Sequence, residues 1–95
     1  MSRAIVLDYR PGALAELERT VLEAIEYGAQ QVVLNLDTLR VLDNDGIRDL
    51  IRLLRRSREV GGTLALQTTQ PAVLRTLSVT ALDRVFDMAL PSRST

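Results

Sequence analysis

Short apolar runs typical of β-strands alternate along the chain with segments whose apolar residues recur at helical spacing, and this alternation limits the possible folds. The strand-like runs span residues 4–7, 31–37, 63–68 and 85–90. The helical segments span residues 13–27, about 45–60 and a shorter stretch from Pro71. Strands that alternate with helices are typical of α/β proteins, whose strands pair in parallel through helical crossovers. The sequence therefore predicts a β-α-β-α-β-α-β order and an α/β layered fold.

Glycine and proline mark the ends of these segments. Residues 10–12 (RPG) predict a turn before the first helix, and Gly28 is placed to end that helix in a left-handed conformation. Gly61 and Gly62 stop the second helix, and Pro71 suits the first turn of the third. We expect the helix boundaries near these residues.

The second helix is amphipathic. Its predicted core-facing stripe consists of Ile47, Leu50, Ile51 and Leu54. Its predicted water-facing residues are Arg48, Asp49, Arg52, Arg55, Arg56 and Arg58. Acidic residues interleave with these arginines and aromatic residues are scarce, which does not fit a nucleic-acid interface. We therefore expect a solvated or a protein-binding face, and no nucleic-acid partner.

Length and charge narrow the class of protein. Ninety-five residues fit one domain, so we expect a single domain over residues 1–95 with a polar tail from about 91. Twelve basic and twelve acidic residues cancel, so no overall field attracts nucleic acid or an anionic membrane. No apolar run approaches the ~20 residues needed to span a bilayer, and the first apolar run is too short for a signal peptide. We expect a cytoplasmic protein without direct membrane insertion.

Cysteine and histidine are both absent. Without cysteine, disulfides, thiolate catalysis and zinc-thiolate or iron–sulfur sites are excluded. Without histidine, the usual general base at neutral pH and the commonest metal ligand are missing. We therefore expect no catalytic residues, no metal and no cofactor, and hence a protein that is not an enzyme.

The segment between the second strand and the second helix, residues 41–47 (VLDNDGI), is the candidate functional site. Unpaired backbone N–H groups at a helix start favour a negative charge beside them. Asp43 or Asn44 is placed to cap the helix, which contributes ~1 kcal/mol, and Asp45 to complement the helix dipole, which contributes ~0.3–1 kcal/mol. Helix stability alone thus accounts for the acidic residues. A capped and exposed helix start can also bind a partner.

Two other kinds of chemistry fit this segment poorly. An EF-hand alignment on Gly46 places Val41 at the first ligand position and Arg52 at the last, where calcium needs acidic residues. A catalytic pair of carboxylates lacks an activated nucleophile, because Thr38 is the nearest hydroxyl and the chain has no histidine. The remaining interpretation of residues 41–47 is a protein-binding loop.

An ordered set of motifs resembles the STAS domain family (sulfate transporter and anti-sigma factor antagonist) from about residue 4 to 88. The motifs are residues 32–37 (VVLNLD), residues 42–47 (LDNDGI), a helix ending in Gly61 and Gly62, and residues 82–86 (LDRVF). The resemblance implies a STAS-like mixed sheet of about four to five strands with helices packed mainly on one side. Ala81 stands where family members frequently carry glycine.

In bacterial single-domain members of this family the loop typically reads Asp-Ser-Ser-Gly, and a partner anti-sigma kinase phosphorylates the serine before the glycine. The resemblance places Asp43 at the aspartate, Asn44 at the first serine, Asp45 at the phosphoacceptor and Gly46 at the glycine. Asp45 has no hydroxyl for a serine kinase to modify. Its carboxylate carries about one negative charge against about 1.5–2 for phosphoserine, which makes it a partial and permanent mimic. Two alternatives stay open: a permanently weakened antagonist, or a module whose partner accepts a carboxylate.

The resemblance also implies a partner. The leading hypothesis is a non-enzymatic anti-sigma factor antagonist that binds an anti-sigma factor of the serine-kinase type. The partner-binding residues are then expected to be Asp43, Asn44, Asp45, Gly46, Arg48, Asp49 and Arg52. Alternatives are an accessory STAS subunit that docks on the ATPase of an ATP-driven lipid transporter, and a scaffold in a stress-signalling assembly.

The N-terminal segment departs from the family pattern. Family members usually begin with two strands before the first helix, whereas one fits before Pro11. A missing first strand leaves a sheet edge that a partner or a second copy would cover. A homodimer is therefore among the expected assemblies.

Overall fold

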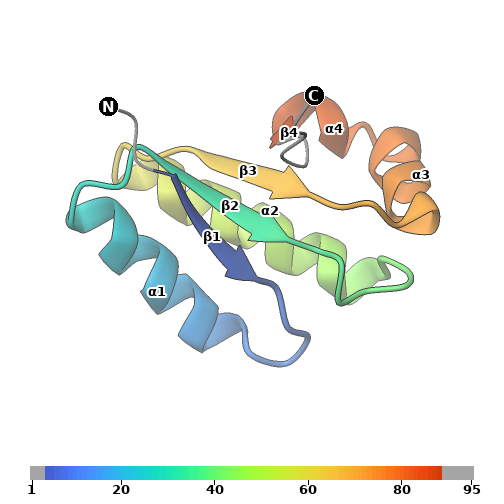
Figure 1. Ribbon diagram of the computed structural model, residues 1–95, viewed down its shortest axis with the longest axis horizontal. Coiled ribbons are helices and arrows are strands. Elements are labelled where there is room, and N and C mark those ends of the chain that lie inside the picture. The colour runs from blue at the N-terminus through green and yellow to red at the C-terminus, as the bar shows by residue number, and fades with distance from the viewer. Residues whose placement is uncertain (1–3, 89–95) are drawn as a thin grey trace, which may run out of the picture.

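The computed structural model describes residues 4–88 of the chain, and Figure 1 shows their arrangement. The elements in chain order are β1 (Ala4–Asp8), α1 (Leu14–Glu26), β2 (Gln31–Asn35), α2 (Asn44–Glu59), β3 (Leu64–Gln67), α3 (Pro71–Val79), α4 (Leu82–Val85) and β4 (Asp87–Met88). The predicted α/β class and the alternation of strands and helices are confirmed. The sequence did not predict the one-turn helix α4.

The four described strands form one sheet in the order β1-β2-β3-β4. All three pairings are parallel, so the described part of the sheet is not mixed as the resemblance implies. Parallel pairing follows from the connections, because a helix-containing crossover separates each strand from the next. The carboxyl ends of parallel strands point the same way. The segments that follow β1, β2 and β3 therefore lie next to one another at the carboxyl ends of the strands.

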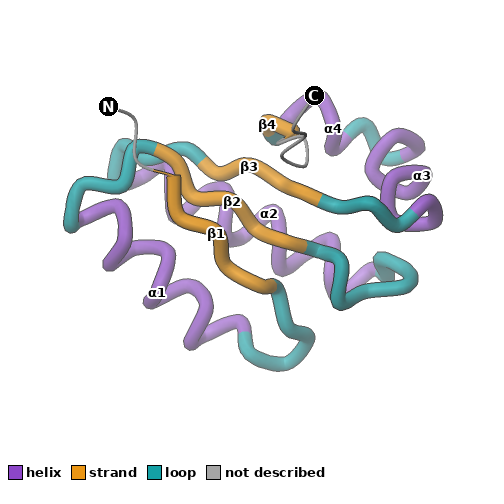
Figure 2. The backbone as a smooth tube through the Cα atoms, viewed as in Figure 1, coloured by secondary structure: helices purple, strands orange, loops and turns teal. Residues whose placement is uncertain are grey.

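Helices α1 and α2 pack against one face of the sheet. In Figure 2, α2 passes behind the strands, and α1 lies beside it on the side of β1. They bury Leu17 and Val21 from α1, and Leu50 and Leu53 from α2, in the main apolar core. The sheet contributes alternate residues of its two central strands to this core: Val32, Leu34, Leu64 and Leu66. No helix within residues 4–88 is both long and apolar enough to cross a membrane.

One described strand, β1, precedes α1 and forms an outer edge of the described sheet. Its side chains are largely exposed, and Val6 keeps 57% of its surface accessible. The expectation that a partner or a second copy covers this edge stays a prediction.

The buried stripe of α2 differs in one position from the prediction. Leu50 and Leu54 are buried as expected, and Ile47 packs partly buried against the core. Ile51, however, is 36% exposed, and its place in the core is taken by Leu53. Successive helical residues are 100° apart, so a core centred on Leu50 and Leu53 turns Ile51 onto the flank of the helix.

The predicted strand 85–90 is wrong at its start. Val85 ends helix α4, β4 begins at Asp87 and is described as far as Met88, and residues 89 and 90 lie outside the described residues. Leu82 and Phe86 are both buried, and the backbone N–H of Phe86 donates to the carbonyl oxygen of Leu82 at 2.9 Å, which closes a helical turn. The predicted glycine ends are confirmed, since Gly28 and Gly61 both have positive φ.

Candidate functional site

Helix α2 begins with a side-chain cap. Asp43 has extended backbone angles, and its carboxylate Oδ1 accepts a 2.9 Å hydrogen bond from the backbone N–H of Gly46. The carbonyl oxygen of Asp43 accepts the N–H of Ile47 at 3.0 Å, which closes the first helical turn. Of the two candidates from the sequence, Asp43 is therefore the cap, and Asn44 is the first residue of the helix.

Gly46 is buried where the helix start packs most closely on the rest of the protein. A Cβ atom at this position would lie 2.7 Å from Leu42 Cδ1, 3.4 Å from Asp43 Oδ1 and 3.8 Å from the hydroxyl of Tyr9. Because Leu42 is itself in the core, it has little room to move. Gly46 is thus needed for close packing, and its φ angle is not positive.

Asp45 presents its carboxylate to solvent in the first turn of α2. The side chains of Asp43, Asn44 and Asp45 are all exposed. Within residues 4–88, no hydrogen bond or ion pair engages the carboxylate of Asp45. The positive end of the helix dipole lies beside this carboxylate. An acidic group is therefore stable at this position and available for contact.

Tyr9 holds α2 against the segment that follows β1. Its ring is buried, and its hydroxyl donates a 2.7 Å hydrogen bond to Asp49 Oδ2. Its carbonyl oxygen accepts the hydroxyl of Thr38 at 2.7 Å, so the same residue also positions the segment after β2. Burial raises the pKa of Tyr9, and the hydrogen bond to Asp49 and the charges of Asp49, Asp43 and Asp45 raise it further.

The role of Asp49 therefore differs from the predicted water-facing one. The residue is half-buried, and Tyr9 occupies one of its oxygens. Sequence reasoning did not identify Tyr9 as part of the site. A single tyrosine after a strand forms no sequence pattern that indicates a role in the site.

A second group of hydrogen bonds joins the segment after β2 to the segment after β3. Asp37 accepts hydrogen bonds from the backbone N–H of Thr69 at 2.7 Å and from the Thr68 hydroxyl at 3.0 Å. The hydroxyl of Thr69 donates to the other oxygen at 3.2 Å. The backbone bond from Thr69, followed by the two hydroxyl bonds, lowers the pKa of Asp37. This arrangement ties the start of the loop before α2 to the end of β3.

The exposed flank of α2 continues the site along the helix. Asp45, Arg48, Asp49 and Arg52 recur at spacings of three and four residues, so they share one side of α2. Arg48 is exposed and forms no ion pair with any residue in the described range. The seven residues predicted to bind a partner are thus brought together, with Gly46 buried beneath the others and Asp49 partly engaged.

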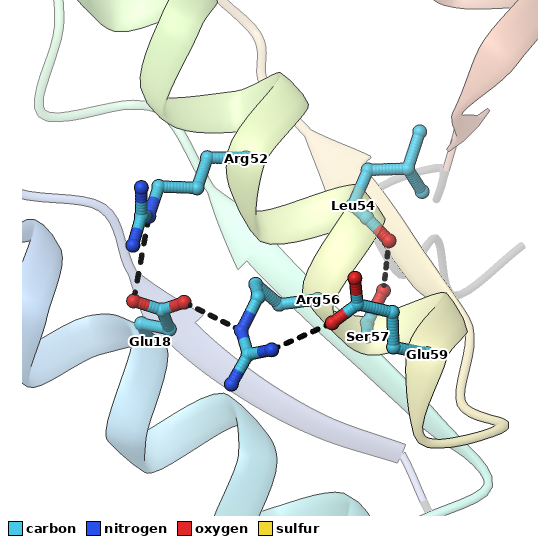
Figure 3. A network of polar contacts seen from close by, with 6 residues as sticks. All are labelled: Glu18, Arg52, Leu54, Arg56, Ser57 and Glu59. Atoms are coloured by element: carbon cyan, nitrogen blue, oxygen red, sulfur yellow. Dashed lines mark hydrogen bonds and ion pairs between the residues drawn. The ribbon is translucent and has the colours of Figure 1, made fainter.

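Glu18 of α1 connects this flank to the neighbouring helix, as Figure 3 shows. Its carboxylate lies 3.5 Å from Arg52 Nε and 2.9 Å from Arg56 Nε. Arg56 also pairs with Glu59 at 2.6 Å. The hydrogen bond to Glu59, followed by that to Glu18, raises the pKa of Arg56. These exposed pairs each contribute little to stability, but together they fix the orientation of the arginines.

Metal ligands do not cluster within residues 4–88, and the serine of α2 is not accessible for modification. Within residues 4–88, no group of three or more His, Cys, Asp or Glu side chains is arranged to hold a metal ion. Ser57 is fully buried, and its hydroxyl donates to the carbonyl oxygen of Leu54 at 2.8 Å, which removes it from the accessible hydroxyl groups (Figure 3).

Comparison with known proteins identifies the family. A family model of the STAS domain matches residues 12–94, which include the loop before α2, α2 itself and the C-terminal half of the chain. The chain therefore belongs to the STAS domain family, as its motifs predict. Strand β1 precedes the matched residues. No curated protein matches the chain at the required significance.

Two solved structures of one protein, TM1081 from Thermotoga maritima, share the fold. The NMR structure superimposes with a TM-score of 0.70 at 21% identity, covering 90% of this chain and 73% of the other. The crystal structure, described as that of a candidate anti-sigma factor antagonist, gives a TM-score of 0.66 at 22% identity, covering 97% of this chain and 76% of the other. At such low identity the similarity establishes the fold alone.

Proposed function

We propose that this STAS protein is a non-enzymatic regulator that binds an anti-sigma factor of the serine-kinase type. The contact surface is the loop 43–46 together with the exposed side chains of Arg48, Asp49 and Arg52. The observation that carries the proposal is the exposed carboxylate of Asp45, which no residue in the described range engages, in the first turn of α2. The family resemblance gives this position to the phosphorylated serine.

In this proposal the site keeps its binding role and has lost its phosphorylation switch. Asp45 supplies about one negative charge without a kinase, and that charge neither appears nor disappears with signalling. The cap from Asp43 and the close packing at Gly46 fix the backbone of the turn that carries Asp45. A partner of this protein therefore meets a permanently acidic helix start.

The experiment restores the missing hydroxyl. Co-purification from native lysate first identifies the cognate partner. If that partner is a serine kinase, we expect it to transfer phosphate to the Asp45→Ser variant and to leave the wild-type chain unlabelled, as measured by intact-protein mass. Asp45→Asn, which keeps the shape and removes the charge, is the control for binding. A cognate kinase that binds the wild-type protein but leaves Asp45→Ser unlabelled would show that the role carried over to Asp45 is wrong.

The same co-purification separates the alternative partners. Recovery of a transporter ATPase would favour the accessory-subunit role. A large particle on size-exclusion chromatography would favour a scaffold in a multi-protein assembly. Either result would replace the anti-sigma partner in this proposal.

A further inference from the structure

An open groove of about 860 Å³ runs between α1 and α2, and Arg48, Asp49 and Arg52 of the candidate site form part of its lining. Its apolar lining comes from both helices and includes Leu14 and Leu22 of α1 and Ile51 of α2. Ile51 occupies a position that the sequence predicts to be buried, yet it is 36% exposed in this groove. Leu14 and Leu22 are half-buried. Apolar side chains that gather along a groove are typical of protein-binding surfaces.

The two walls of the groove carry opposite charges. The α1 wall includes Glu23 and Glu26, and the α2 wall includes Arg48 and Arg55. None of these four forms an ion pair within residues 4–88. The bridge from Glu18 to the α2 arginines crosses the groove between them. Arg19 is the one basic residue on the acidic wall. Asp49 and Glu59 are the acidic residues on the α2 wall; Tyr9 donates a hydrogen bond to Asp49, and Glu59 pairs with Arg56.

We infer that this groove binds an amphipathic helix of the partner protein, with acidic side chains toward α2 and basic side chains toward Glu23 and Glu26. The inference rests on the proposed function, because it names the part of the partner that would contact the flank of α2. Both walls are helices whose backbone groups are already paired, so the groove offers no free strand edge to an extended peptide. The acidic wall would repel a nucleic-acid phosphate backbone.

The dimensions of the groove suit a short helix. Helix α1 has 13 residues, which corresponds to a length of roughly 20 Å at 1.5 Å per residue. A partner helix of about four turns would follow this length and place an apolar ridge of residues i, i+3, i+4 and i+7 over Leu14, Leu22 and Ile51.

The test uses a designed helical peptide as the probe. The peptide carries leucine along one ridge, glutamate along one flank and lysine along the other. A control peptide has the same composition with glutamate and lysine mixed on both flanks. In an NMR titration of the ¹⁵N-labelled protein, we expect saturable shifts confined to α1 and α2, with the segregated peptide binding several-fold more tightly than the mixed one.

Protein variants then test the named contacts. Ile51→Glu should weaken binding of the segregated peptide by about tenfold or more, because it places a charge in the apolar floor. The matched control is Leu74→Glu on α3, which starts from a similar exposure of 42% and should leave binding unchanged. Arg48→Glu with Arg55→Glu should remove the preference for the segregated peptide. Folding of each variant is checked from the dispersion of its amide resonances.

Three results would overturn the inference: absence of saturable binding, equal affinity for both peptides, or shifts centred on the sheet face that carries Val6 and Val33. The outcome is separable from that of the proposed function. If Ile51→Glu binds the identified anti-sigma partner as well as wild type does while Asp45 variants change that binding, the groove is wrong and the proposed function stands. If the peptide binds as expected but the partner is a transporter ATPase, the groove stands and the proposed function is wrong.

Discussion

Helices α2 and α4 begin in contrasting ways. Helix α2 starts from the extended residue Asp43, whose side chain caps the first turn. Helix α4 starts after Ala81, a non-glycine residue in the left-handed conformation (φ 61°) with no side-chain cap. The first start is supported by local hydrogen bonds, whereas the second is maintained by the burial of Leu82 and Phe86 despite an unfavourable backbone.

The difference shows how the protein presents its acidic loop. Asp43, Gly46 and Tyr9 each fix the start of α2 by a separate contact, so the neighbouring Asn44 and Asp45 remain exposed without loosening the helix. The start of α4 holds no predicted partner-binding residue, and Ala81 adopts a strained left-handed conformation there. Four substitutions test this contrast.

Gly46→Val should lower the free energy of unfolding more than the other substitutions. The added side chain would collide with Leu42 in the core, and overpacking of this kind costs about 2–3 kcal/mol of unfolding free energy. Urea denaturation followed by circular dichroism measures the loss. Asn44→Val, in the same turn but exposed, should change stability by no more than about 0.5 kcal/mol. Equal losses in the two variants would show that Gly46 is not needed for close packing.

Tyr9→Phe should cost about 1.5 kcal/mol, because it removes a hydrogen bond to a charged group. The raised pKa of Tyr9 also predicts a pH effect. Above the ordinary tyrosine pKa of about 10, the unfolded chain releases the proton while the folded chain retains it, so stability should fall as pH rises further.

The measurement is denaturation between neutral pH and alkaline pH, in a Tyr27→Phe background that leaves Tyr9 as the single tyrosine. Absorbance of the phenolate reports ionisation directly. A Tyr9→Phe variant with the same alkaline loss of stability as its parent would assign that loss to other groups.

Asp43→Ala should destabilise the protein by about 1 kcal/mol through loss of the cap. Asn44→Ala is the matched control, since its side chain makes no capping bond and should have little effect. Thermal unfolding compares the two variants. If Asn44→Ala proved the more damaging change, the assignment of the cap to Asp43 would have to be abandoned.

Ala81→Gly should have the smallest effect and the opposite sign. Glycine adopts the left-handed conformation without steric cost, so we expect a gain of about 0.5–1 kcal/mol after the entropy of the unfolded glycine is subtracted. Ala15→Gly, at an exposed site within α1, should instead cost about 1 kcal/mol. A loss of stability in Ala81→Gly would mean that the start of α4 is not strained.

Local patterns predicted much of the fold. The helix boundaries at Gly28 and Gly61 lie where the sequence indicates, because positive φ is a property of single residues. The last strand is predicted to begin two residues too early, since the apolar run 85–90 has no periodicity that separates a helical turn from a strand. Ile51 was placed in the core because several neighbouring apolar residues fit the same helical stripe.

The candidate site was predicted as a set of exposed residues but not as a structure. The polar residues at the start of the second helix predict a cap by Asp43 or Asn44, and the hydrogen bond from the Gly46 N–H to Asp43 shows that Asp43 is the cap. The contacts of Tyr9 with Asp49 and of Glu18 with Arg56 join residues 40 and 38 positions apart. Such pairs have no sequence signature, because neither partner alone carries a local pattern that points to the other.

The sequence by itself determined the order of strands and helices, the acidic start of α2 and the absence of a hydroxyl at position 45. These depend on side-chain chemistry and on periodicity within one element. Tertiary structure decided that Tyr9 would engage Asp49, that Ile51 would face a groove and that α1 and α2 would present walls of opposite charge. Those features arise when parallel crossovers bring separate elements together. How the elements align when they pack cannot be predicted from the sequence of either element alone.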